Sequence, residues 1–174
     1  KAAEIYSNHK YPASSFLPKD FGFYDHEKIR VGYFSPDFRD HPVSHLTAEL
    51  YEMHDRSKFE IHAFSFCIDT NDELNMRIRK GVDYFHCVHS MPDQEVVSLS
   101  RSLELDIAVD LAGFTKGSRP RIFSLLAAPV QLGYVGFLGT MGSNYYDYLI
   151  SDKTIIPEKN KKYYSENIAY LPSY

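Results

Sequence analysis

Asp37 and His41, two side chains able to bind or move a proton, stand four residues apart directly after an apolar run at residues 29–34. Pro42 suits the first turn of a helix, so the segment joins a strand to a helix. A helix N-terminus disfavours an imidazolium, so we expect His41 to be neutral and able to hydrogen-bond a sugar hydroxyl or a phosphate. Asp37 could accept a proton or fix the tautomer of His41. Spacing alone is a weak signal, because a loop Asp is more often a turn residue.

Two glycine-containing segments are further candidates for ligand binding. Residues 112–119 open a predicted helix, where backbone N–H groups can meet an anion, although the Walker spacing is absent. Residues 136–142 carry glycines at a spacing of three, which allows the backbone to approach another group closely. That group could be a ligand or a neighbouring helix, so both interpretations stay open for each segment.

No metal site is predicted. His41 and His45 stand at i and i+4, but no third ligand pattern accompanies them. The sequence also has no Asp-x-Asp pair of the kind that holds a metal-bound sugar nucleotide. His62, His86 and His89 lie in or beside predicted strands, and we expect them to be structural.

Charge and composition exclude several classes of protein. A net charge of -4 argues against a general nucleic-acid binder, which needs clustered Lys and Arg. No apolar stretch is long enough for a membrane span. Cys67 and Cys87 form no CxxC pair and are expected to be buried, reduced thiols in a cytoplasmic protein.

Short apolar runs alternate with helical patterns, which predicts an α/β, Rossmann-like fold with a mostly parallel sheet and helices on both faces. The expected strands are residues 29–34, 59–67, 82–88, 105–111, 130–135, 148–151 and 167–171. One expected helix starts at Pro42, and three others cover residues 71–80, 93–103 and 119–127.

Helical spacing and strand ends make two further predictions. In the helix that starts at Pro42, an apolar face is expected to comprise Val43, Leu46, Thr47 and Leu50. Ligands of parallel sheets bind beyond the carboxyl ends of strands, so we expect the site in the loops after the first, fourth and fifth strands.

Several strings, taken together and in order, resemble one family, the O-linked N-acetylglucosamine transferases and their bacterial relatives. The opening string is RVGYFSPDFRDHP at residues 30–42. DIAVDLAGFT at residues 106–115 and the segment 128–142 resemble further family motifs, as do residues 147–152 and 171–172. The resemblance covers about residues 28–174.

The resemblance implies one half of a two-domain, GT-B-type glycosyltransferase. Residues 1–27 would be a linker with a short helical segment, and residues 28–174 the N-terminal Rossmann-like catalytic half-domain. The implied reaction is inverting and independent of metal or cofactor. It moves N-acetylglucosamine from UDP-N-acetylglucosamine to Ser or Thr of an acceptor protein. A C-terminal catalytic half and tetratricopeptide repeats are the partners expected in the full-length protein.

Family residues can be carried over by position. Asp37 matches an Asp proposed as the catalytic base, and His41 is the second expected catalytic residue. The expected substrate-binding residues are Pro42, Val43, Val135, Gly136, Gly139 and Thr140.

Two departures from the family pattern leave the donor sugar open. Val43 stands where better-known members have Thr, and Leu138 replaces Pro in the glycine loop. One alternative is therefore a glucosyltransferase of the adhesin-modifying type. Another is a non-catalytic interaction module beside tetratricopeptide repeats, although the presence of both Asp37 and His41 weighs against it. Without a second Rossmann-like domain, this chain alone is expected to be inactive or nearly so.

Overall fold

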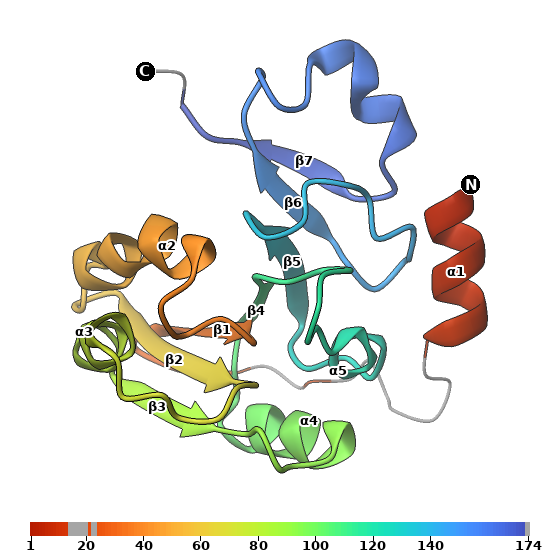
Figure 1. The fold of residues 1–174 in the computed structure, drawn as a ribbon. Coiled ribbons are helices and arrows are strands. Elements are labelled where there is room, and N and C mark those ends of the chain that lie inside the picture. Colours follow the sequence, from red (N-terminus) through yellow and green to blue (C-terminus); the bar gives the residue numbers. More distant parts are fainter. Residues whose placement is uncertain (14–20, 22–23, 173–174) are drawn as a thin grey trace.

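Seven strands form one sheet in the order β3-β2-β1-β4-β5-β6-β7, and every neighbouring pair is parallel (Figure 1). This computed structural model describes residues 1–13, 21 and 24–172. The strands are β1 (Ile29–Ser35), β2 (Phe59–Ser65), β3 (Tyr84–Cys87), β4 (Ile107–Asp110), β5 (Val130–Tyr134), β6 (Tyr148–Ser151) and β7 (Asn167–Tyr170). All seven predicted strands and the Rossmann-like fold class are confirmed, with shorter bounds for several strands.

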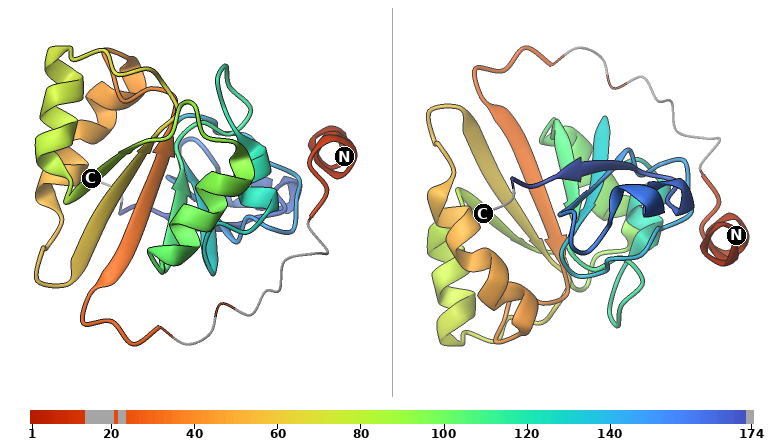
Figure 2. Two further views of the ribbon diagram at one scale, coloured as in Figure 1. Left: turned by 90° about the horizontal axis from the view of Figure 1, so that it is seen from below. Right: turned by 90° about the horizontal axis from the view of Figure 1, so that it is seen from above.

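Helices cover both faces of the strands at the β3 side of the sheet (Figures 1 and 2). The helices are α1 (Ala2–Lys10), α2 (Pro42–Met53), α3 (Glu73–Gly81), α4 (Asp93–Ser102), α5 (Pro120–Ser124) and the 3-10 helix η1 (Glu158–Tyr163). α5 is shorter than predicted because Leu126 adopts a left-handed φ of 61°. In the described residues, no helix has the length and apolar character needed to cross a membrane.

Two buried clusters lie on opposite faces of the sheet, because successive side chains of a strand point to opposite sides. Tyr33 belongs to the cluster under α2 and α3, which includes Ile78. Its neighbour Phe34 belongs to the cluster under α4 and α5 and stacks on Phe64 with ring centroids 4.4 Å apart. The two clusters hold the carboxyl ends of β1 and β4 between layers of helix.

The buried face of α2 differs from the predicted one. The buried side chains are Ser44, Thr47, Ala48 and Tyr51. Leu46, predicted to be on the apolar face, is 68% exposed. Of the predicted face, Thr47 is buried and Val43 and Leu50 are partly buried, so the prediction was wrong for Leu46. Polar groups can occupy this face because they are paired: the Tyr51 hydroxyl donates to Thr47 Oγ1 at 2.9 Å.

Neither cysteine matches the expectation of a buried thiol. Cys67 is half-buried and Cys87, at the end of the edge strand β3, is exposed. Both are free thiols. Cys87 Sγ lies 3.3 Å from a guanidinium nitrogen of Arg79.

The burial of α2 and α3 can be tested by paired truncations. Ile78→Ala, at a fully buried position, should lower the free energy of unfolding by about 2–5 kcal/mol. Leu46→Ala should change it by less than about 0.5 kcal/mol because the side chain faces solvent. Urea unfolding followed by circular dichroism gives both values. A large loss for Leu46→Ala would show that α2 buries the face first predicted from the sequence.

Candidate active site

Three loops meet at the carboxyl edge of the sheet, where the strand order reverses between β1 and β4. They follow β1 (residues 36–41), β4 (residues 111–119) and β5 (residues 135–147). A Cβ placed on Gly117 would lie 3.0 Å from Pro36 Cβ, so the loops after β1 and β4 are in contact. These are the loops in which the sequence predicts the site.

Asp37 is buried at the start of the first loop, with its side chain 8% exposed. Its backbone is held on both sides: its N–H donates to Ser35 Oγ at 2.9 Å, and Ser44 Oγ donates to its carbonyl oxygen. Arg39 Nη2 donates to Asp37 Oδ1 at 3.2 Å. The second carboxylate oxygen, Oδ2, faces the ring of His41.

His41 is the N-cap of α2, and its Nδ1 accepts a hydrogen bond from the backbone N–H of Val43 at 3.3 Å. Because Nδ1 is used as an acceptor, Nε2 is the ring nitrogen left to donate. Nδ1 is 3.6 Å from Asp37 Oδ2, too far for a hydrogen bond. Among the described residues Nε2 has no partner, so its N–H is able to donate to a ligand.

Val135 and Gly136 form a strained turn where β5 ends. Val135 has a φ of 60°, which a β-branched residue rarely adopts. The N–H of Gly136 donates to the carbonyl of Tyr134 at 2.8 Å, which closes a three-residue turn. Such strain persists where the surrounding structure enforces it, and it is concentrated at functional sites.

Predicted residues that follow β1 and β5 in the chain lie on the same face of the sheet. Val43 and Val135 both pack against the buried cluster that contains Phe38 and Leu111. Pro42 is exposed in the first turn of α2. The structure therefore brings Asp37 and His41 together and places the Val135 turn on the same cluster.

Gly139 and Thr140 belong to the same loop after β5 but lie away from this cluster. Gly139 packs on the ring of Phe137, which belongs to the opposite cluster. The Thr140 hydroxyl contacts Glu166, Ser165 and the N–H of Gly142, so the protein already engages it.

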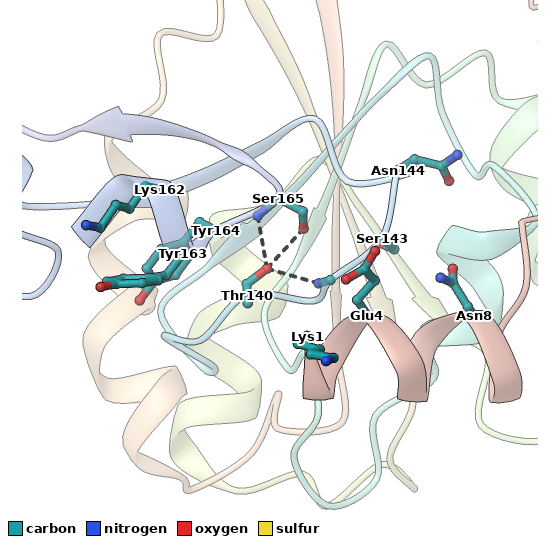
Figure 3. Close-up of a pocket in the computed structure, with 11 residues that line it drawn as sticks. Lys1, Glu4, Asn8, Thr140, Ser143, Asn144, Lys162, Tyr163, Tyr164 and Ser165 are labelled. Carbon is teal, nitrogen blue, oxygen red and sulfur yellow. Dashed lines mark hydrogen bonds between the residues drawn. The ribbon is translucent and has the colours of Figure 1, made fainter. Parts of the chain in front are cut away.

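A separate pocket of about 680 Å³ also includes Thr140. It lies between α1 and the segment at residues 162–165, where Lys162 and Tyr163 line it (Figure 3). The roles of Gly139 and Thr140 in ligand binding stay predictions.

Asp110 is a residue whose role the sequence did not reveal. Its buried Oδ1 accepts hydrogen bonds from the N–H groups of Ala112 at 2.9 Å and Gly113 at 3.0 Å. Oδ2 accepts one from the Tyr146 hydroxyl. Burial raises the pKa of the Asp110 carboxyl, although these hydrogen bonds oppose the shift. The one sequence signal was an acid within an otherwise apolar strand.

Within residues 1–13, 21 and 24–172, no three His, Cys, Asp or Glu side chains come together in a way that could hold a metal ion. His45, the i+4 neighbour of His41, instead has its Nε2 2.8 Å from Asp40 Oδ1. His62 is buried between Glu60 and His86, at 2.9 Å and 3.1 Å, in agreement with a structural role.

The close approach at Gly136 can be tested by adding one carbon. A Cβ there would lie 1.8 Å from the carbonyl oxygen of Leu111, and a backbone oxygen cannot rotate away. Gly136→Ala should therefore lower the free energy of unfolding by about 1–3 kcal/mol. Gly81→Ala is the control, because its nearest neighbour is the flexible Glu52 Cγ at 3.3 Å. Equal thermal stability of the two variants would contradict this packing.

Asp110 makes a prediction about pH. An acid whose pKa is raised by folding binds its proton more tightly in the folded state, so its contribution to stability falls as pH rises from the ordinary Asp value of about 3.9 through the raised folded pKa. Asp110→Asn keeps an oxygen for the two N–H groups and carries no charge. The difference in unfolding free energy between variant and wild type should move in favour of the variant between pH 4 and pH 7. A constant difference would show that the buried charge is unimportant.

Comparisons with known proteins agree on one family. The family model for glycosyl transferase family 41 matches residues 5–174. A probable UDP-N-acetylglucosamine-peptide N-acetylglucosaminyltransferase, SEC, of Arabidopsis thaliana is 34% identical over 93% of this chain and 16% of its own length. The UDP-N-acetylglucosamine-peptide N-acetylglucosaminyltransferase of Caenorhabditis elegans is 29% identical over 87% of this chain and 13% of its own.

A solved structure shares the fold. A mutant O-GlcNAc transferase of Thermobaculum terrenum superposes with a TM-score of 0.87 and 28% identity, covering 99% of this chain and 33% of that one. This chain thus spans about a sixth of the length of the Arabidopsis relative and a third of the solved structure. With its sequence motifs, parallel sheet and family match in agreement, the chain belongs to glycosyl transferase family 41.

Proposed function

We propose that this chain is one half of the catalytic region of an inverting protein glycosyltransferase, which moves N-acetylglucosamine from UDP-N-acetylglucosamine to Ser or Thr hydroxyls. The observation that carries the proposal is the placement of Asp37, His41 and the strained Val135–Gly136 turn at one edge of the sheet. The names of the Arabidopsis and Caenorhabditis relatives support the donor and the peptide acceptor.

The proposed reaction has a simple balance of bonds. The acceptor oxygen forms a bond to C1 of the sugar, the bond between C1 and the UDP oxygen breaks, and the sugar configuration inverts. UDP leaves with the electron pair of that bond, and the proton of the acceptor hydroxyl passes to a base. Two needs follow for the protein: an acceptor for that proton and donors that orient the sugar.

His41 and Asp37 meet these needs from the end of β1. The Nε2–H of His41 is directed away from the helix contact made by Nδ1, so it is available to a sugar hydroxyl or a phosphate oxygen. Asp37 offers a carboxylate whose backbone is fixed by Ser35 and Ser44. Arg39 donates to Oδ1 of that carboxylate and so helps to fix its orientation. The other oxygen, Oδ2, is left facing His41.

The remaining parts of the reaction belong to the full-length protein. We propose that a second Rossmann-like half holds the UDP moiety, that tetratricopeptide repeats present the acceptor protein, and that the protein works in the cytoplasm. The reaction is proposed to use no metal or cofactor, with charge on the diphosphate stabilised by protein groups instead. Pro42, Val43 and the Val135–Gly136 turn would contact the sugar.

The experiment is steady-state transfer by the full-length protein, with release of UDP as the readout. His41→Ala and Asp37→Ala should each lower kcat about a hundredfold or more, as expected for loss of a group that handles a proton or positions the sugar. His45→Ala is the matched control, since its side chain is 63% exposed and pairs with the exposed Asp40. Unchanged turnover in His41→Ala would remove His41 from the mechanism.

The same assay tests the donor. Faster turnover with UDP-glucose than with UDP-N-acetylglucosamine would replace the proposed sugar. Absence of any UDP release from either donor by the wild-type protein would contradict the proposed function.

A further inference from the structure

Glu166 is a buried acid that precedes β7 and is only 6% exposed. Its Oε1 accepts a hydrogen bond from the N–H of Met141 at 2.6 Å, and its Oε2 accepts one from Thr140 Oγ1 at 2.7 Å. Among the described residues no Lys, Arg or His nitrogen lies within 4.0 Å of it. A buried carboxylate without a cation depends on its hydrogen bonds, so the two donors and the carboxylate hold one another in place.

Thr140 extends this arrangement through its hydroxyl. A hydroxyl has one proton to donate, and the bond to Glu166 Oε2 uses it. The same oxygen then accepts from the N–H of Gly142 at 3.0 Å and of Ser165 at 3.2 Å (Figure 3). Glu166 therefore determines which way the Thr140 hydroxyl donates, and this hydrogen-bond network closes the turn at residues 140–142.

This turn is the far end of the loop that begins with the strained residue Val135. At the near end, Gly136 lies against the Leu111 carbonyl, and in the middle Phe137 packs against Gly113 and Gly139. Strain at a residue such as Val135 persists only if the surrounding structure determines the backbone on both sides. The far side is held by Glu166 through Thr140 and Met141, and by α1, where Ser7 Oγ donates to the Met141 carbonyl.

Strand pairing gives Glu166 a rigid base. The next residue, Asn167, pairs with Tyr148 of β6, and its N–H donates to the carbonyl of Asp147 at 3.0 Å. A side chain directly beside a paired strand can hold a loop more accurately than one in the middle of another loop. The paired strand fixes the backbone next to Glu166, and the Glu166 carboxylate in turn fixes the loop.

We propose that Glu166 is a positioning residue for the donor sugar. By fixing Thr140 and Met141, it holds the Val135–Gly136 turn in the shape that meets the sugar. The identity of the ligand, a donor sugar, rests on the proposed function. The effect of Glu166 on the shape of the loop does not depend on it.

The structural part is tested in the full-length protein by NMR with selective amide labelling of valine and glycine. Glu166→Gln keeps the size of the side chain and an oxygen for Met141 but gives up the acceptor for Thr140. We expect it to shift the amide resonances of Val135 and Gly136. Glu158→Gln is the control, because Glu158 is 59% exposed and pairs with Lys161 on the surface. Unmoved Val135 and Gly136 resonances in Glu166→Gln would overturn the inference.

The functional part is tested in the full-length protein by separating KM from kcat. Glu166→Gln should raise KM for UDP-N-acetylglucosamine about tenfold, since a small misplacement of a contact is costly. Inhibition by UDP, which lacks the sugar, should be unchanged. A merely structural role would instead lower kcat in proportion to the folded fraction and leave KM unchanged, and that result would overturn the proposal.

Variants of Thr140 complete the test. Thr140→Val removes the hydroxyl that donates to Glu166 Oε2 and should raise KM as Glu166→Gln does. The double variant should be no worse than either single one, because both act through one network. Additive increases in KM would mean that Glu166 and Thr140 act independently, which would contradict the proposal. An inactive wild type would contradict the proposed function together with this inference, whereas an active wild type with an unaffected Glu166→Gln would contradict this inference alone.

Discussion

At the carboxyl edge of the sheet, the backbone of Gly136 lies directly against the carbonyl oxygen of Leu111. No side chain fits between them, so the end of β5 is pressed onto the end of β4. Phe137 then follows along the neighbouring loop, where glycines at 113 and 139 leave room for its ring. Val135, the residue before this contact, has a left-handed φ of 60°.

Two buried carboxylates hold the loops that surround this contact. Asp110, the last residue of β4, accepts backbone N–H groups of the loop that follows it. Glu166, just before β7, accepts a backbone N–H and a hydroxyl from the loop after β5. In both cases an acid on or beside a paired strand orients a loop that lacks regular structure. Asp37 differs from them, because its carboxylate contacts Arg39 and faces His41.

Much of the fold was predictable from the sequence because parallel strands buried on both faces are nearly continuous apolar runs. Ile107–Asp110 and Val130–Tyr134 are such runs, and both were located. The loop after β1 was predictable as a site because Pro42 marks the start of a helix. The family resemblance then supplied Val135 and Gly136, which spacing alone did not distinguish from an ordinary tight turn.

Other features depend on pairing that a hydrophobic pattern does not record. Ser44 is buried on α2 because its hydroxyl bonds the Asp37 carbonyl, and Leu46 is consequently turned to solvent. Glu166 gave no signal, since a single acid before a short strand resembles any surface residue. Its partners Thr140 and Met141 lie about 25 residues away in sequence, and only the folded chain brings them together.

The central claim is that Asp37, His41 and the Val135–Gly136 turn form one wall of a donor-sugar site. The most direct measurement is a crystal structure of the full-length protein with UDP-N-acetylglucosamine bound. We predict the sugar ring in contact with the His41 imidazole and the Val135–Gly136 backbone, on the face of the sheet covered by α2. A sugar bound instead in the pocket beside Tyr163, with no contact to His41, would contradict this account.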